Sequence, residues 1–291
     1  MKGPAAPVVV GVDGSSSALF AVKWAAAECA RHHAPLRLVH AYSLPLRGYP
    51  EIILTGQEIR RAIEEQAGGW LSDAAAVARG VASEVEITTE LRCDGVITML
   101  IEESRNARLM VLGSQGLGNI TGLLVGSTAI AMASHGKCPL VVVRGTEFPT
   151  GPVVVGVDGS PTSEAALAFA FETASMRDAP LTVVMCWHDF MIESAYTASR
   201  FTVDWGQVEE AEQRLLAERL AGFQDKYPDV QVHRVVVRDR PVRALMRYGS
   251  EAQLLVVGSH GHGGFAGMLL GSTSQALVYN SPCPLAIVRP D

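Results

Sequence analysis

The stretch Leu109-Met110-Val111-Leu112-Gly113-Ser114-Gln115-Gly116 joins a short apolar run to a glycine-rich loop. After nine further residues comes Gly126-Ser127-Thr128, which opens an alanine-containing segment suited to a helix. The apolar run predicts a buried strand, so the whole segment is expected to form strand, loop and helix. A loop of this kind turns backbone N–H groups toward one point, and the helix N-terminus adds partial positive charge there. The segment therefore predicts an anion site, and phosphate is the anion that we expect.

The same pattern occurs a second time, 145 residues further along the chain. The second glycine loop is Gly258-Ser259-His260-Gly261, and Gly271-Ser272-Thr273 follows it after nine residues. The segment Pro7–Ser15 also recurs residue for residue as Pro152–Ser160. Repeats that keep one offset at all these places indicate two copies of one unit in tandem.

Each copy is predicted to alternate strands and helices. In the first copy the expected strands cover 8–12, 36–42, 84–92, 109–112 and 139–143, and the expected helices cover 16–32, 55–80, 95–105 and 127–135. Asp94 and its counterpart Asp239 are expected to cap the third helix of each copy. Apolar strands that alternate with helices predict an α/β fold, a doubly wound parallel sheet with helices on both faces. We expect one such domain at 1–146 and another at 151–291, joined by a short turn-prone linker.

Composition excludes several classes of protein. The chain of 291 residues is 48% hydrophobic and 19% charged, which is typical of a soluble globular protein of about two domains. Its net charge of −6 argues against a nucleic-acid partner. Neither a membrane span nor a signal peptide is indicated, so we expect a cytoplasmic protein. Five widely spaced cysteines without a C-x-x-C pair predict neither a disulfide framework nor a zinc site.

Two polar features follow strands of the predicted sheet. Asp13 comes directly after the first strand, and the loop that begins at Gly113 comes directly after the fourth. Ligands of open parallel sheets bind at the carboxyl ends of the strands. The two features therefore share one site if the first and fourth strands are neighbours, which the pattern alone does not establish.

These motifs resemble those of the universal stress protein family. The resemblance rests on V-V-V-G-V-D-G-S at the start of each copy, on G-x2-G-x9-G-[ST], and on the ending C-P-L-V-V-V-R of the first copy. It covers nearly the whole chain, as in tandem-domain members, and the glycine spacing is similar to that of the ATP-binding branch. The resemblance implies two five-stranded parallel sheets of order 3-2-1-4-5, with strands one and four side by side. It also implies that the copies pack through their last strands, Leu140–Val143 and Leu285–Val288.

The resemblance further implies one ATP in each copy, two per chain. Any Mg²⁺ is expected to come in with the nucleotide, held mainly by phosphate oxygens and water. Adenosine would lie beside the first strand, adenine would meet the backbone at the end of the second strand, and the phosphates would meet the glycine loop and the following helix. The implied nucleotide-binding residues are, in the first copy, Gly11, Val12, Asp13, Ala41, Gly113, Ser114, Gln115, Gly116, Gly118, Gly126, Ser127 and Thr128 and, in the second, Gly156, Val157, Asp158, Cys186, Gly258, Ser259, His260, Gly261, Gly263, Gly271, Ser272 and Thr273.

Simpler explanations exist for these residues. The glycines fit a strand-to-helix turn that needs positive φ. Asp13 and Asp158 fit turn residues that bind their own backbone, and Ser127 and Ser272 fit helix caps. His260 and His262 lack a third ligand, so no metal site is expected there.

Other nucleotide motifs fit less well. Gly261–Ala266 matches the dinucleotide pattern G-x-G-x-x-[GA], but Thr121 breaks the pattern in the first copy and no acidic residue lies about 20 residues on. A Walker A motif is absent from the sequence.

The expected function is a nucleotide-dependent regulator of the stress response. Bound nucleotide would order the glycine loops and the segments 43–54 and 188–206, altering a surface that protein partners, whose identity is left open, recognise. Two alternatives stay open, a slow ATP hydrolase or phosphotransferase and a scaffold with vestigial sites. No catalytic residue is assigned, because no candidate base accompanies the loop in both copies, and a homodimer is left open.

Overall fold

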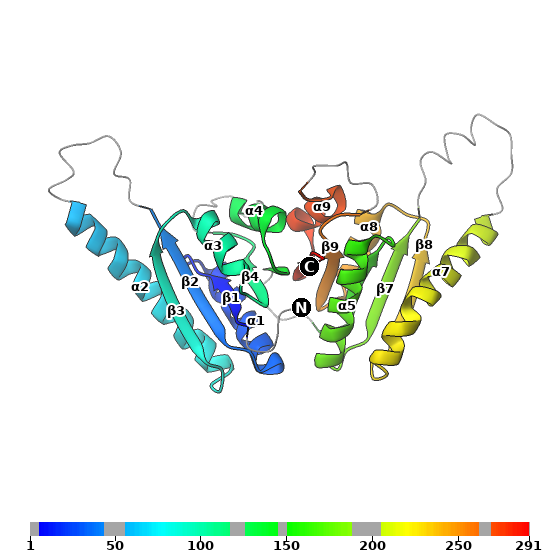
Figure 1. Ribbon diagram of the computed structural model, residues 1–291, viewed down its shortest axis with the longest axis horizontal. Coiled ribbons are helices and arrows are strands. Elements are labelled where there is room, and N and C mark those ends of the chain that lie inside the picture. The colour runs from blue at the N-terminus through cyan, green and yellow to red at the C-terminus, as the bar shows by residue number, and fades with distance from the viewer. Residues whose placement is uncertain are drawn as a thin grey trace, which may run out of the picture. The chain divides into compact units, whose positions relative to one another are not determined.

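The computed structural model describes residues 6–43, 56–116, 126–144, 150–187, 205–261 and 269–290. The chain divides into two compact units, the first built from Met1–Phe148 with Pro284–Arg289 and the second from Pro149–Cys283. Each unit alternates strands and helices, with parallel strands covered by helices (Figure 1).

In the first unit the central strand is β1 (Val8–Gly11). Its neighbours are β2 (Leu36–Tyr42) and β4 (Leu109–Gly113), and the outer parallel strands are β3 (Ile87–Cys93) and β5 (Leu140–Val143). All four pairings among these strands are parallel, in the order β3-β2-β1-β4-β5. Val8 is level with both Leu36 and Leu109, so the first and fourth strands are neighbours, as the shared site requires.

Helices cover both faces of this sheet. α1 (Ser16–His32) packs with α2 (Gly56–Val81), and α3 (Val96–Ser104) packs with α4 (Ser127–His135) (Figure 1). Right-handed crossovers place the first pair on one face and the second on the other, because the chain reverses direction across the sheet after β3. The centre of the sheet is therefore buried on both sides, and the valines of β1 are fully inaccessible.

The second unit repeats four of the five strands. β6 (Val153–Val157), β7 (Leu181–Cys186), β8 (Val232–Val237) and β9 (Leu254–Gly258) pair in parallel in the order β9-β6-β7-β8. Its helices are α5 (Pro161–Met176), α7 (Trp205–Lys226), α8 (Pro241–Gly249) and α9 (Ser272–Asn280).

The last strand of the second copy pairs with the last strand of the first. β10 (Leu285–Val288) belongs to the first unit, where it runs antiparallel to β5 with Ile287 opposite Leu140. The expected pairing of the two last strands is thus confirmed. The strand order also sets β10 beside β9, so the strands of the second copy follow the expected order β8-β7-β6-β9-β10, and the fully buried β10 covers the otherwise open edge of β5.

Smaller corrections concern element ends. The third strand begins at Ile87 instead of residue 84. The N-caps of α3 and α8 are Gly95 and Arg240, and neither has a side-chain cap. Asp94 and Asp239 stand one residue earlier and accept from the N–H of the capping residue, both at 2.6 Å. Within the described residues, no helix is both long and apolar enough to cross a membrane.

One turn at the end of β1 shows why the repeated Asp-Gly pair is there. Gly14 has φ +82°, and a Cβ placed on it would lie 2.5 Å from the indole of Trp70 on α2. Gly159 has the same φ in the second copy. The turn therefore needs glycine both for its backbone conformation and for the close approach of the next layer.

We expect Gly14→Ala to destabilise the protein by about 1–3 kcal/mol, because alanine is strained at positive φ and its methyl group meets Trp70. Gly69→Ala is the matched control: it lies within α2, and none of the described residues would come within 4 Å of its new methyl group. That change should stabilise by up to about 1 kcal/mol. Thermal unfolding of both variants measures the contrast, and equal effects would contradict it.

Candidate functional site

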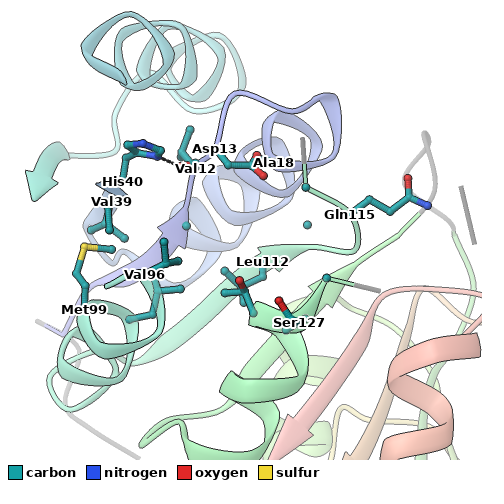
Figure 2. Close-up of a pocket in the computed structure, with 18 residues that line it drawn as sticks. Val12, Asp13, Ala18, Val39, His40, Val96, Met99, Leu112, Gln115 and Ser127 are labelled. Atoms are coloured by element: carbon teal, nitrogen blue, oxygen red, sulfur yellow. Dashed lines mark hydrogen bonds between the residues drawn. The ribbon is translucent and has the colours of Figure 1, made fainter. Parts of the chain in front are cut away.

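A cavity of about 570 Å³ opens at the carboxyl ends of β1 and β4 in the first unit (Figure 2). It is bounded by the turn after β1, the end of β2, the glycine loop after β4, the helix α3 and the start of α4. Its lining residues are Gly11, Val12, Asp13, Ala18, Val39, His40, Ala41, Val96, Met99, Leu100, Leu112, Gly113, Gln115, Gly116, Gly126, Ser127, Thr128 and Ala129.

Most of the residues implied for the first copy thus meet in one cavity. Ser114 does not line it: its N–H donates to Val143 O and its carbonyl accepts from Gly126 N–H. Gly118, Gly263 and His262 lie outside the described residues, as do most of the segments 43–54 and 188–206 and the linker. The cavity assembles the predicted groups, and their roles in binding stay predictions.

Asp13 occupies the β1 side of the cavity. Its Oδ1 accepts from the N–H and the hydroxyl of Ser15, at 3.0 and 2.6 Å, so the carboxylate does bind its own turn. The other oxygen, Oδ2, faces the glycine loop and lies 2.7 Å from a Cβ built on Gly116. One oxygen therefore holds the turn, while the other is directed toward the space that the loop encloses.

His40 contacts the main chain of this turn. Its Nδ1 lies 2.6 Å from Val12 O, and because a carbonyl only accepts, Nδ1 carries the proton. The imidazole meets Trp70 edge-on, with ring centroids 5.4 Å apart. Sequence reasoning had no signal for this contact, since His40 looks like an ordinary polar residue of an alternating strand.

The glycine loop is built by close approach of backbone to backbone. A Cβ on Gly113 would lie 2.7 Å from the carbonyl carbon of Ser17, in the first turn of α1. Gln115 N–H donates to the Ser17 hydroxyl at 3.3 Å. Any side chain at Gly113 would push the loop away from α1, so the glycine requirement at this position is steric.

Gly126 differs from the other glycines of the cavity. It is the N-cap of α4 with φ −60°, which any residue adopts, and it provides no side-chain cap. Among the described residues, nothing lies within 4 Å of a Cβ built there. Neither backbone strain nor contact with the part of the chain that the structure describes explains a glycine here, and Gly126 lines the cavity, so a side chain at this position would extend into it.

The start of α4 supplies the polar groups on the opposite side from Asp13. Ser127 and Thr128 line the cavity, and Ser127 follows the N-cap instead of forming it. The reading of Ser127 and Ser272 as caps is therefore wrong, because Gly126 and Gly271 hold those positions. The first amides of a helix lack intrahelical acceptors, and together with the helix dipole they favour an anion.

An apolar wall completes the cavity, and sequence reasoning missed it. Val96, Met99 and Leu100 come from α3, and Val39 and Leu112 come from β2 and β4. Their spacing of three and four residues on α3 marks one helix face. Such an apolar helix face ordinarily packs in the hydrophobic core. Here it lines the cavity because α3 lies over the ends of the strands.

The second copy brings the corresponding residues together differently. Asp158 Oδ1 accepts from Ser160 N–H at 3.0 Å, as in the first copy, but a Cβ on Gly261 would overlap Asp158 Oδ2 more severely. Arg219, not a tryptophan, packs on Gly159 and donates to its carbonyl at 3.1 Å. Burial raises the pKa of the Cys186 thiol to about 11, so this side chain is neutral at physiological pH.

The site offers little to a metal ion by itself. Among the described residues, no three His, Cys, Asp or Glu side chains gather to hold one. Asp13 is the one acidic residue among those that line the cavity. Mg²⁺ that enters with a nucleotide fits this arrangement, because it takes most of its oxygen ligands from phosphate and water.

Comparison with known proteins extends the resemblance over both copies. The family described as "Universal stress protein family" matches residues 5–144 and 150–289. A universal stress protein of Mycolicibacterium smegmatis is 39% identical over 294 residues, covering 97% of each chain. One of Mycobacterium tuberculosis is 36% identical over 290 residues, covering 97% of this chain and 96% of its own. A solved universal stress protein of Archaeoglobus fulgidus shares the fold, with a TM-score of 0.66 at 17% identity over 97% of this chain and 98% of its own.

Gly126 allows a test of the cavity that leaves the fold alone. Gly126→Val should stay folded and unfold only slightly below the temperature of the unmodified protein, because the backbone is unstrained and a Cβ meets no described atom, while valine is a poorer N-cap than glycine. The isopropyl group should fill the space beside the glycine loop and weaken binding of a fluorescent ATP analogue by at least about tenfold, the cost of displacing one phosphate contact. Undiminished binding to a folded variant would exclude the cavity as the ligand site.

Proposed function

This chain belongs to the universal stress protein family, and from that premise we propose that it binds ATP in the cavity of its first copy and a second ATP at the matching place in its second copy. In this proposal adenine lies between the apolar wall and the backbone around Ala41. The ribose hydroxyls donate to Asp13, and the phosphates lie along the glycine loop and the start of α4. A cytoplasmic location is part of the proposal, since ATP is available there.

The proposal rests on the observation that the cavity is apolar at one end and polar at the other. One wall is formed by Val39, Val96, Met99, Leu100 and Leu112 and suits a flat apolar base. The other end presents hydroxyls, bare glycine backbone and a helix N-terminus, which suit phosphate. Asp13 follows β1 and its Oδ2 faces the glycine loop, and in this proposal it takes the sugar of the nucleotide.

The proposed biological role is regulation of the stress response by nucleotide occupancy. A bound nucleotide shifts a conformational balance only as far as its affinities for the two states differ. We propose that occupancy changes the surface around the glycine loops, and that protein partners recognise that surface. Slow hydrolysis is the second candidate. It is favoured only by the proximity of Asp13 to the loop, where the carboxylate would have to orient a water molecule.

Three measurements test the proposal. Mass spectrometry of the ligand released from the purified, unheated protein should identify an adenine nucleotide, and titration of the stripped protein should restore binding. Phosphate release under excess ATP should be negligible compared with binding. Release that is rapid in the unmodified chain and lost in Asp13→Ala would replace the binder by an enzyme, whereas a chain that takes up no nucleotide would be a scaffold.

Asp13→Asn separates the two tasks of this carboxylate. The asparagine Oδ1 still accepts from Ser15, so the turn should persist, but the amide nitrogen no longer accepts from a ribose hydroxyl. Loss of a hydrogen bond to a charged group should weaken ATP binding at the first copy roughly 10- to 150-fold. The control is Asp158→Asn, which should leave the first site unchanged. Calorimetric titration of both variants decides, and equal losses at the first site would refute the assignment.

Ser127→Ala tests the phosphate end of the same site. Because Gly126 is the N-cap, removing the Ser127 hydroxyl should leave the stability of α4 unchanged. A hydrogen bond to phosphate contributes about 1.5–3 kcal/mol, so ATP affinity should again fall by one to two orders of magnitude. Ser72→Ala, an exposed position on α2, is the matched control. A loss of thermal stability without a loss of affinity would mean that Ser127 serves the helix alone.

A further inference from the structure

The two glycine loops differ in what binds their backbone carbonyls. In the second copy the Thr162 hydroxyl donates to His260 O. The Ser274 hydroxyl donates to Gly258 O at 2.6 Å, in a buried contact. We call Thr162 and Ser274 the latch hydroxyls.

The first copy has different residues at both latch positions. Ala129 stands where the second copy has Ser274, so Gly113 O receives no hydroxyl from that position. Ser17 stands where the second copy has Thr162, and its oxygen accepts from a loop N–H at 3.3 Å instead of donating to a loop carbonyl.

The loop carbonyl of Gln115, the counterpart of His260 O, has a weaker partner in the first copy. The Ser15 hydroxyl reaches it at 3.3 Å, and the same hydroxyl lies 2.6 Å from Asp13 Oδ1. A hydroxyl has one proton to donate, and the shorter contact to the carboxylate competes for it. The hydroxyl that reaches Gln115 O is therefore shared with a carboxylate, whereas His260 O receives the hydroxyl of Thr162.

The loop of the second copy also lies closer to the helix that follows it. A Cβ on Gly271 would be 3.3 Å from His260 Cα and 3.4 Å from Ser259 O. At the corresponding Gly126, no described residue comes within 4 Å. Ser259 is 1% exposed and Gly271 is buried, whereas Ser114 and Gly126 are half-buried. The space between loop and helix start, which forms part of the cavity in the first copy, is narrow in the second.

We propose that the two latch hydroxyls, Thr162 on α5 and Ser274 on α9, hold the glycine loop of the second copy in place, so that the second site binds nucleotide more weakly than the first and binds it after the first. This inference rests on the proposed function and adds the order in which the sites fill. Phosphate enters the second site only when the loop moves away from Gly271, and that movement breaks the contacts of Thr162 and Ser274. A ligand that binds a minor state loses apparent affinity in proportion to the population of that state.

The size of the difference follows from the contacts. A hydrogen bond contributes a net 0.5–1.5 kcal/mol, so two of them separate the affinities by about 5- to 150-fold. The first site should therefore be filled at nucleotide concentrations at which the second is largely empty. The second site would respond to nucleotide over a higher range of concentration.

The test uses the full chain and ATP as the probe. Calorimetric titration of the unmodified protein should show two steps, and Gly126→Val should weaken the tight step by at least about tenfold and leave the weak one unchanged. In that background, Thr162→Val together with Ser274→Ala should strengthen the weak step by about tenfold, because both loop carbonyls lose their donors. Thermal stability should fall slightly at the same time. A merely structural role of the two hydroxyls would lower stability and affinity together.

Two further variants sharpen the result. Thr162→Ser keeps a hydroxyl and should leave the weak step as it is. Ala129→Ser places the missing hydroxyl in the first copy and should weaken the tight step. Equal affinities in the unmodified chain, or a weak step that the double change leaves unaltered or weakens, would overturn the inference alone. An unmodified chain that binds no ATP would overturn the proposed function as well.

Discussion

Parallel pairing of β1 with β4 is the constraint on which the rest of this structure depends. The register that sets Val8 level with Leu109 brings the turn at Asp13 and the loop at Gly113 to the same edge of the sheet. Because the chain reverses its direction across the sheet at this pair, the helices on either side diverge and leave a space between them. The cavity therefore follows from strand order, and its chemistry follows from the few residues placed at the strand ends.

Within that frame, glycine serves the site for different reasons at different positions. Gly14 is needed for a left-handed turn, and Gly113 for contact with the first turn of α1. Gly126 has neither a left-handed backbone conformation nor a close contact with a described residue. The distinction matters because only the last kind of glycine points to a ligand, and a motif made of all three kinds looks uniform in the sequence.

The sequence predicted much of this architecture, and the failures have physical causes. Alternating apolar strands and helices were enough for the α/β class and for the bounds of α1, α4 and β2. Strand order came from family resemblance, because buried parallel strands carry no mark of their neighbours. The apolar wall of α3 was missed since a cavity-facing helix face has the same periodicity as a core-facing one. The latch hydroxyls of Thr162 and Ser274 are visible as differences between the copies, but their partners are backbone carbonyls, which leave no trace in a sequence.

The position of β10 has a consequence for synthesis on the ribosome. This strand is translated after every other strand of the second copy, yet it pairs with β5 in the first unit. The backbone groups on the outer edge of β5 therefore stay unpaired while the second copy emerges from the exit tunnel. The first unit is begun before the second and completed after it, so any nascent chain that stops short of β10 releases a first unit with an open edge.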